Sequence, residues 1–184
     1  MFLRISSGEL RGRQIRVPMT DLRPTGEKVR SALFDSLFSM IHFENRSFLD
    51  IFSGSGIFAL EAVSRGFKSA VSIEKNPKAF AQIRSSIAEL ALNDRVSAIN
   101  SDAFSFDYDS LKPQKYSTVF LDPPYALGGE IPSLLDKIAV SGIVDEVCVI
   151  IVEGDSETEW TAPGWSRKTK KFGGTHLTFF YNWE

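Results

Sequence analysis

From residue 47 onward, short strand-like runs alternate with segments of helical spacing, and this alternation restricts the fold more than any other feature. Such a series predicts an α/β fold, with a mostly parallel, doubly wound, Rossmann-like sheet. Gly173-Gly174, between the strand-like residues 167–172 and 176–181, predicts an antiparallel hairpin at the C-terminal edge of that sheet. The other predicted strands are residues 48–52, 69–74, 96–100, 118–121 and 147–152, and the predicted helices are residues 57–65, 77–92 and 130–140.

The N-terminal part of the chain differs from this series. Residues 2–5 and 14–17 predict two short strands of a hairpin. Residues 26–41 carry apolar side chains at helical spacing, which predicts an amphipathic helix. We therefore expect two regions, an N-terminal basic hairpin and helix over 1–46 and an α/β domain over 47–184.

The net charge of −2 conceals an uneven distribution of charged residues. Residues 1–30 hold seven Lys or Arg against three Asp or Glu, and residues 160–184 hold four against one. The body between them, residues 31–159, holds ten against nineteen. Basic ends on an acidic body predict a polyanion that is bound by the ends. Short termini that bind nothing also have skewed charge, and the charge count leaves that alternative open.

Composition excludes several classes of protein. The chain has one cysteine, Cys148, and two histidines, His42 and His176, which predicts neither an internal disulfide nor a metal centre. It contains no apolar run of the roughly 18 residues that a transmembrane helix needs, and its N-terminus lacks the apolar core of a signal peptide. We therefore expect a cytoplasmic protein that binds no metal and no membrane, with a monomer as the starting hypothesis.

Asp122-Pro123-Pro124-Tyr125 directly follows the apolar run 119–121. Because two prolines prevent the strand from continuing, these residues should lie at its carboxyl end. Ligands of open parallel α/β sheets bind at that edge. The Asp122 carboxylate and the Pro123 carbonyl can accept hydrogen bonds from an exocyclic NH₂ group, and the Tyr125 ring can stack on a planar base. The motif therefore predicts a site for an amine-bearing ring.

A second motif joins the first predicted strand of the α/β domain to its helix. Gly54 and Gly56 allow a sharp turn and a close approach of the backbone to a ligand. Asp50 precedes this turn. Glu74 ends the next strand, where a carboxylate can accept hydrogen bonds from ribose hydroxyls. Asp102 follows the third strand, within reach of an adenine amine. Together these residues predict a nucleoside-binding edge.

Two alternative interpretations remain open for the same segment. Gly54, Gly56 and Ala59 match the dinucleotide pattern G-x-G-x-x-G/A, and Glu74 lies 20 residues after Gly54, so a nicotinamide enzyme is an alternative. Against it, Asp50 would repel a pyrophosphate, and the Asp-Pro-Pro-Tyr motif has no evident role in hydride transfer. Alternatively, the glycines form only a turn, Asp50 caps it, and Glu74 is a solvated strand end.

Taken together, these motifs resemble those of S-adenosylmethionine-dependent methyltransferases that act on exocyclic amines. Over its whole length, the chain is similar to the bacterial 16S rRNA guanine-N2 methyltransferase family, which modifies guanine 966 of the small subunit. The segments that carry the resemblance are Arg4-Ile5-Ser6-Ser7-Gly8, Arg11-Gly12-Arg13, Arg23-Pro24-Thr25, Val29-Arg30, Leu33-Phe34, Asp50 to Gly56, Leu60-Glu61-Ala62, Ser64-Arg65-Gly66 and Asp122 to Tyr125.

This resemblance implies a Rossmann-like methyltransferase fold, the cofactor S-adenosylmethionine, and 16S rRNA or the small ribosomal subunit as the partner. It implies that Asp122, Pro123 and Tyr125 hold the target base. The cofactor would be bound by Asp50, Gly54, Gly56, Glu74 and Asp102. The RNA would be bound by Arg4, Arg11, Arg13, Arg16, Arg23, Lys28 and Arg30.

The chain departs from the family pattern in three places. Glu27-Lys28 stands where members often have Asp-Arg, Tyr125 stands where Phe also occurs, and the segment with Gly128-Gly129 is less basic than expected. The Asp-Pro-Pro-Tyr motif also serves enzymes that methylate adenine in DNA or glutamine in proteins, so these targets stay open. A nucleic-acid-binding module without catalytic activity is a further alternative, against which the intact Asp122 and Pro123 argue.

Overall fold

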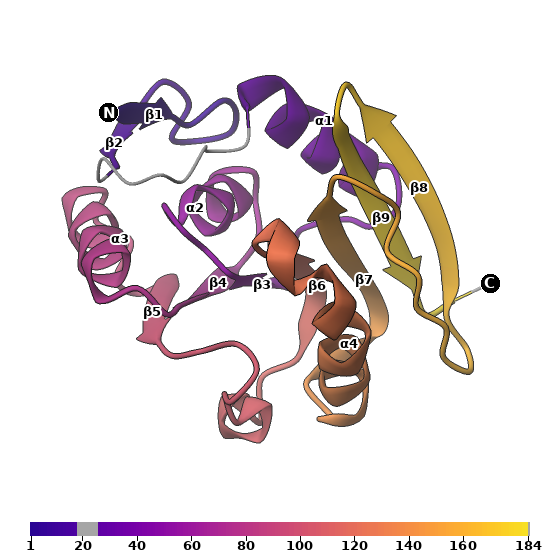
Figure 1. The fold of residues 1–184 in the computed structure, drawn as a ribbon. Coiled ribbons are helices and arrows are strands. Elements are labelled where there is room, and N and C mark those ends of the chain that lie inside the picture. The colour runs from indigo at the N-terminus through magenta and orange to yellow at the C-terminus, as the bar shows by residue number, and fades with distance from the viewer. Residues whose placement is uncertain (18–25, 184) are drawn as a thin grey trace.

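The computed structural model describes residues 1–17 and 26–183. Its main sheet has seven strands in the order β5-β4-β3-β6-β7-β9-β8 (Figure 1). Neighbouring strands from β5 to β7 are parallel, whereas β9 is antiparallel to both β7 and β8. The predicted α/β fold with an antiparallel C-terminal edge is confirmed, and β8 is the outermost strand at that edge, opposite β5. The strands are β3 (Ser47–Ile51), β4 (Ser69–Glu74), β5 (Val96–Asn100), β6 (Tyr116–Leu121), β7 (Val144–Gly154), β8 (Ser166–Phe172) and β9 (Thr175–Tyr181).

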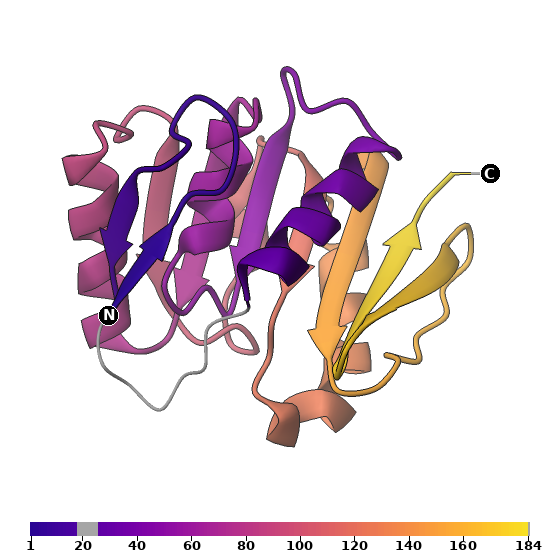
Figure 2. The same cartoon turned by 90° about the horizontal axis from the view of Figure 1, so that it is seen from above.

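Helices cover both faces of this sheet (Figures 1 and 2). One buried apolar cluster lies on the face with α1, α2 and α3, where Phe34 and Phe58 pack near Phe120 of β6. A second buried apolar cluster lies on the opposite face and includes Leu135 of α4 and Tyr108. The helices are α1 (Glu27–Phe38), α2 (Ile57–Ser64), α3 (Pro77–Glu89) and α4 (Ile131–Val140), and the 3₁₀ helices are η1 (Tyr108–Leu111) and η2 (Tyr125–Glu130).

Local chemistry explains where α3 begins and ends. The Asn76 side chain accepts hydrogen bonds from the N–H groups of Lys78, at 2.9 Å, and Ala79, at 3.2 Å, while Pro77 occupies the first helical position. The helix ends at Glu89, before the predicted residue 92, because Ala91 adopts a left-handed conformation with φ of 56°. The helix predicted over 26–41 likewise ends early, at Phe38. Neither 3₁₀ helix was predicted from the sequence.

The N-terminal hairpin docks on the end of α2. Strands β1 (Phe2–Arg4) and β2 (Gln14–Arg16) form their own antiparallel sheet, as predicted. The Glu9 N–H donates to the Ser64 carbonyl at 2.8 Å, and Gly8 has a φ of 84°. A Cβ atom at Gly8 would lie 1.7 Å from that carbonyl oxygen, so only glycine permits this approach.

The hairpin shares its core with the rest of the molecule. Ile5, Ile15 and Leu33 of the N-terminal region are buried in the same apolar cluster as the sheet residues on that face. The division into regions 1–46 and 47–184 stays a prediction. Within residues 1–17 and 26–183, no helix is long and apolar enough to cross a membrane, and no group of three or more His, Cys, Asp or Glu side chains has the geometry of a metal site.

Candidate active site

The predicted site residues gather where the strand order of the sheet reverses. The chain runs from β3 to β4 and β5 on one side and then returns to β6 on the other side of β3. Ile51 lies opposite Ile73 of β4 and Leu121 of β6, and the Asp122 N–H donates to the Ile51 carbonyl at 3.4 Å. In Figure 2 the parallel strands point toward one edge, where the chain continues into η2. Ligands of open α/β sheets bind at this edge.

Asp50 is a buried carboxylate near the end of β3. Only 1% of its surface is exposed, and its Oδ2 atom has no hydrogen-bond partner among the described residues. Burial raises the pKa of the Asp50 carboxyl well above its ordinary value. A hydrogen bond from the Ala59 N–H lowers this pKa, but the negative charges of Asp122 and Glu74 raise it further. A buried acceptor without a donor is unfavourable. This arrangement therefore favours a ligand that brings a cationic N–H donor.

Glu74 at the end of β4 is held by backbone groups on both sides. One carboxylate oxygen accepts from the Gly54 N–H and the other from the Asn76 N–H, each at 2.7 Å. The residue is buried, with 8% of its surface exposed, so it is not the solvated strand end of the alternative interpretation. Each oxygen keeps a further lone pair, with which the carboxylate can accept from ligand hydroxyls.

The two glycines of the loop serve different purposes. Both have positive φ, 54° at Gly54 and 73° at Gly56. A Cβ at Gly56 would lie 3.0 Å from two side-chain carbons of Ile83 in α3, so this glycine permits close packing at the start of α2. A Cβ at Gly54 would meet nothing nearer than the Phe52 carbonyl oxygen, at 4.0 Å. Gly54 therefore forms the turn and leaves the space in front of it open.

Asp102 has partners that the sequence did not reveal. Its Oδ2 atom forms an ion pair with Lys75 Nζ at 2.6 Å, and its Oδ1 atom accepts from the Phe104 N–H at 2.9 Å. The hydrogen bond from Lys75 lowers the pKa of the Asp102 carboxyl. Because the Lys75 side chain is 76% exposed, it can move away from Asp102 without leaving a packed interior. A ligand amine would compete with Lys75 for this carboxylate.

The Asp-Pro-Pro-Tyr motif presents three different groups at the end of β6. Asp122 is half-buried and Pro123 is buried. No residue of the described part of the chain donates a hydrogen bond to the Pro123 carbonyl, whereas the next carbonyl, of Pro124, accepts from the Leu127 N–H at 2.9 Å and begins η2. Tyr125 is 70% exposed, so its ring is not packed on the turn. Two acceptors and an exposed ring thus follow the end of β6, and the charge of Asp122 is close enough to Asp50 to raise its pKa.

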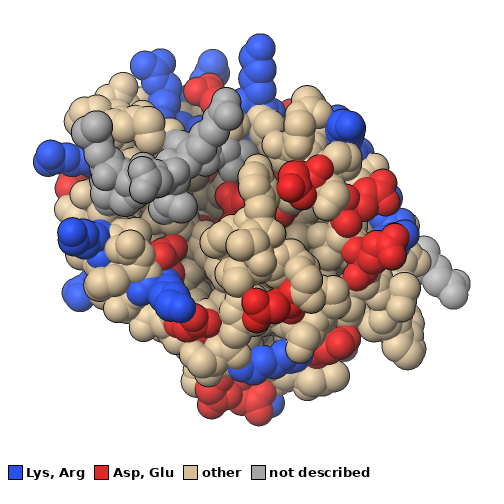
Figure 3. All heavy atoms as spheres, viewed as in Figure 1, with Lys and Arg blue, Asp and Glu red and all other residues tan. Residues whose placement is uncertain are grey.

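Most of the predicted RNA-binding residues lie on the surface. Lys28 is exposed in the first turn of α1, whereas Arg23 lies outside the described residues. In the face seen in Figure 3, Lys and Arg are frequent along the upper and left rim, and Asp and Glu lie across the centre and right. The exposed arginines of the hairpin region, none of which forms an ion pair with a described residue, are Arg4, Arg11, Arg13 and Arg16.

The RNA-binding prediction for Arg30 is wrong. Its side chain is 2% exposed, and its Nε atom pairs with Glu61 Oε1 at 3.3 Å inside the core. Its Nη2 group donates to the Arg4 carbonyl at 3.0 Å, so Arg30 ties α1 to the hairpin. Glu61 also pairs with Arg65, at 3.1 Å, and accepts from the Ser6 N–H at 3.0 Å. This buried network has a structural role.

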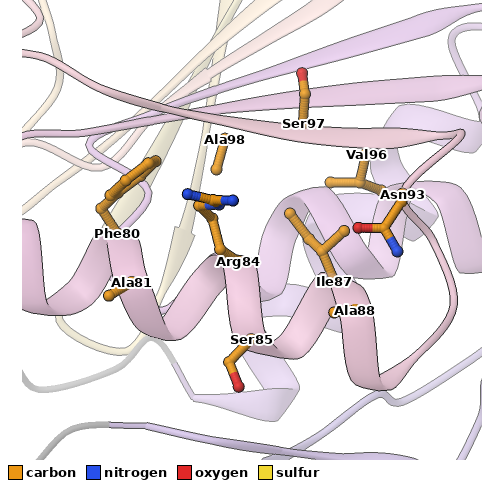
Figure 4. A pocket seen from close by; sticks show the side chains of 10 residues that line it. All are labelled: Phe80, Ala81, Arg84, Ser85, Ile87, Ala88, Asn93, Val96, Ser97 and Ala98. Carbon is orange, nitrogen blue, oxygen red and sulfur yellow. The ribbon is translucent and has the colours of Figure 1, made fainter.

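A groove of about 590 Å³ lies elsewhere, between α3 and the edge strand β5 (Figure 4). Ile87, Val96 and Ala98 line it, and the guanidinium of Arg84 lies 5.8 Å from the centre of the Phe80 ring. None of the predicted site residues and no carboxylate line this groove. The chemistry of the carboxyl edge therefore identifies the candidate active site better than the size of a hollow.

The order of the sheet, the antiparallel β9 beside β7, and the carboxylates at the switch point define an α/β methyltransferase fold. The RNA methyltransferase from Salinibacter ruber, solved in complex with S-adenosyl-L-homocysteine, shares this fold with a TM-score of 0.65 and 18% identity, over 88% of this chain and 95% of that one.

The chain belongs to the family described as conserved hypothetical protein 95, whose model matches residues 3–181. Ribosomal RNA small subunit methyltransferase D of Escherichia coli K12 is 35% identical over 176 residues, which cover 94% of this chain and 85% of that protein. The solved structure of the Escherichia coli protein yhhF has a TM-score of 0.83 and 31% identity, and covers 100% of this chain and 99% of that one. The family membership inferred from the sequence is thereby confirmed.

Proposed function

We propose that this protein transfers a methyl group from S-adenosylmethionine to an exocyclic amine of rRNA, and that the acceptor is the N2 amine of guanine 966 in 16S rRNA. The observation that carries the proposal is the buried carboxylate of Asp50, whose Oδ2 atom has no described hydrogen-bond partner, near the two acceptors of Asp122-Pro123. The 35% identity to a small-subunit rRNA methyltransferase supports rRNA as the substrate.

The residues at the edge of β3 and β4 fit the chemical groups of this cofactor. Asp50 would bind its ammonium group, which supplies the missing donor and the opposite charge. Glu74 would accept from the ribose hydroxyls, and Asp102 would accept from the adenine amine in competition with Lys75. When bound, S-adenosylmethionine supplies an electrophilic methyl group on a positively charged sulfur.

The end of β6 would hold the acceptor amine. A guanine N2 lone pair is delocalised into the ring, so the free amine is a poor nucleophile. If Asp122 and the Pro123 carbonyl each accept one of its N–H groups, the nitrogen becomes more pyramidal and its lone pair is directed away from both acceptors. The Asp122 carboxylate also stabilises the positive charge that develops on nitrogen as the N–C bond forms, and it can accept the N–H proton that the methylated nitrogen then loses. Fixed orientation of both reactants supplies much of the rate.

The target base must be unpaired or flipped out, at a cost of a few kcal/mol. Stacking on the exposed Tyr125 ring would offset about 1–3 kcal/mol of that cost. The exposed arginines of the hairpin would bind phosphates and position the RNA without reading its sequence. Lys28, in the first turn of α1, and Arg23, which precedes α1 in the sequence and lies outside the described residues, are proposed to act closer to the target base.

The nicotinamide alternative is disfavoured by the charges at the edge. A dinucleotide would place its pyrophosphate against the glycine loop, where the carboxylates of Asp50, Glu74 and Asp122 lie close enough to affect one another electrostatically. A cofactor with an ammonium group and a sulfonium matches this site better.

The proposal is tested by incubating the protein with methyl-labelled cofactor and, separately, 16S rRNA, small-subunit particles, DNA and total protein. Label should enter the rRNA, free or in particles. Asp122→Ala should lose this transfer yet retain most of its calorimetric affinity for S-adenosylhomocysteine, because Asp122 mainly meets the acceptor. The exposed Asp155→Ala is the matched control and should transfer normally. Label in DNA or protein alone, or binding of NAD in place of S-adenosylhomocysteine, would refute the proposal.

A further inference from the structure

Glu153 is a buried carboxylate at the same edge of the sheet, and the chemistry described above gives it no role. It lies near the end of β7, the strand next to β6, and 7% of its surface is exposed. Val152 lies opposite Leu121, so the following residues, Glu153 and Asp122, come next to each other. Adjacent strands lie about 4.8 Å apart, so the two backbones are close neighbours.

The two side chains also lie on the same face. Phe120 and Ile151 belong to the apolar cluster under α1 to α3, whereas Leu121 and Val152 belong to the cluster on the opposite face. Successive residues of a strand point to opposite faces. Glu153 therefore points to the α1 face, as does Asp122 when the alternation of β6 continues for one residue. A row of acceptors thus extends from the Asp-Pro-Pro-Tyr motif toward β7.

The Watson–Crick edge of guanine matches such a row. It presents the N2 amine and, next to it, the N1–H group, which are both donors. Adenine and 2-aminopurine instead carry a bare N1 with a lone pair. A carboxylate accepts hydrogen bonds and donates none, so it attracts an N1–H and repels a bare N1. Enzymes that act on flipped bases read this edge by hydrogen bonds.

We propose that Glu153 accepts a hydrogen bond from the N1–H of the target base while Asp122 and Pro123 hold the neighbouring N2 amine, which makes the site selective for guanine. This inference rests on the proposed function, because it requires a guanine N2 acceptor. It assigns selectivity to Glu153 and amine activation to Asp122. When a base without an N1–H group binds, the Glu153 carboxylate is left without its hydrogen-bond donor. An unmatched buried acceptor of this kind causes strong discrimination against the wrong base.

The test compares two substrates that share the reacting amine. Small-subunit rRNA is prepared with either guanine or 2-aminopurine at the target position, in the form that accepts methyl groups from the wild-type protein. The wild type should prefer guanine by at least about 10-fold in kcat/KM, as expected for one hydrogen bond to a charged group. In Glu153→Gln the side chain is neutral, and its amide can also donate to a bare N1. The preference for guanine should therefore shrink by about 10-fold or more.

Two controls separate selectivity from stability. Glu157→Gln makes the same chemical change at an exposed position just beyond β7 and should leave the preference unchanged. Thermal unfolding verifies that Glu153→Gln is folded. If it is not folded, Glu153→Asp replaces it, because a carboxylate that is shorter by one methylene should also reduce the preference for guanine. If the variant slows both substrates by the same factor, or neither, the inference is wrong. A wild type that leaves guanine unmodified would refute the proposed function instead.

Discussion

Replacing Asp50 with asparagine should separate the stability of the unliganded protein from its affinity for the cofactor. Asp50→Asn keeps the shape of a buried side chain and removes its charge. In the unliganded protein, burial and the nearby charges of Asp122 and Glu74 raise the pKa of Asp50 well above its unfolded value. The folded state then binds more protons than the unfolded state between these two pKa values, so stability falls as pH rises through that window. The variant should lack this component of the pH dependence.

Asp50→Asn should also bind the cofactor less tightly than the wild type. A hydrogen bond to a charged group contributes about 1.5–3 kcal/mol, so removing the charge should weaken cofactor affinity about 10–150-fold. Ligand at 100 times its wild-type Kd stabilises the wild type by about 2.7 kcal/mol, or about 5–11 °C in Tm for a chain of this size. At the same concentration the variant should gain only about 0.3–1.4 kcal/mol.

Differential scanning fluorimetry over a pH series, with and without S-adenosylhomocysteine, measures both effects, and calorimetry gives the affinities. Asp94→Asn, an exposed change in the turn before β5, is the control and should resemble the wild type in both respects. If Asp50→Asn bound the cofactor product with unchanged affinity, the assignment of the buried carboxylate to the ammonium group would be refuted.

Further predictions concern the hairpin, the buried network and the acceptor site. Arg11→Ala with Arg13→Ala should make the dependence of log RNA affinity on log salt shallower by about 0.7–0.9 per lost phosphate contact, as measured by filter binding; an unchanged slope would mean that both are ordinary surface residues. Arg30→Ala leaves Glu61 buried with fewer partners and should destabilise the protein by about 3–5 kcal/mol in urea unfolding; a change below about 1 kcal/mol would contradict the structural role of the pair. Tyr125→Ala should raise KM for rRNA by the loss of about 1–3 kcal/mol of stacking, whereas Tyr125→Phe should retain it.

Much of the fold could be predicted because the residues at the ends of several strands mark where those strands stop. β4 and β5 match the predicted residues 69–74 and 96–100, since an N-capping Asn76-Pro77 and polar turns interrupt the apolar pattern at their ends. The 3₁₀ helix η2 was missed, because Gly128-Gly129 gives it no apolar periodicity. The outermost position of β8 follows from hairpin pairing in three dimensions, which the order of residues along the chain does not specify.

The candidate site could likewise be predicted only in part from the sequence. Asp50, Glu74 and Asp122 could be placed together because parallel strands bring their carboxyl ends to one edge. The ion pair between Lys75 and Asp102 could not be predicted, because it joins the ends of two different strands through side chains that are partly exposed.

Arg30 was misassigned because charge was counted without regard to the helix face. It lies three, four and seven residues before Leu33, Phe34 and Leu37, which are the buried stripe of α1. This spacing places Arg30 on the buried face of α1 and could have indicated that its side chain is buried. Its partner, Glu61, is a carboxylate within an apolar helix whose residues are all buried, which is the corresponding signal in α2.

The most direct test of the central claim is to identify the methylated nucleoside by mass spectrometry after small-subunit rRNA has reacted with labelled S-adenosylmethionine, and to map its position. We predict one product, N2-methylguanosine at position 966, formed by the wild type and absent with Asp122→Ala. Transfer to adenine, to another atom of guanine, or equally to rRNA and DNA would contradict it.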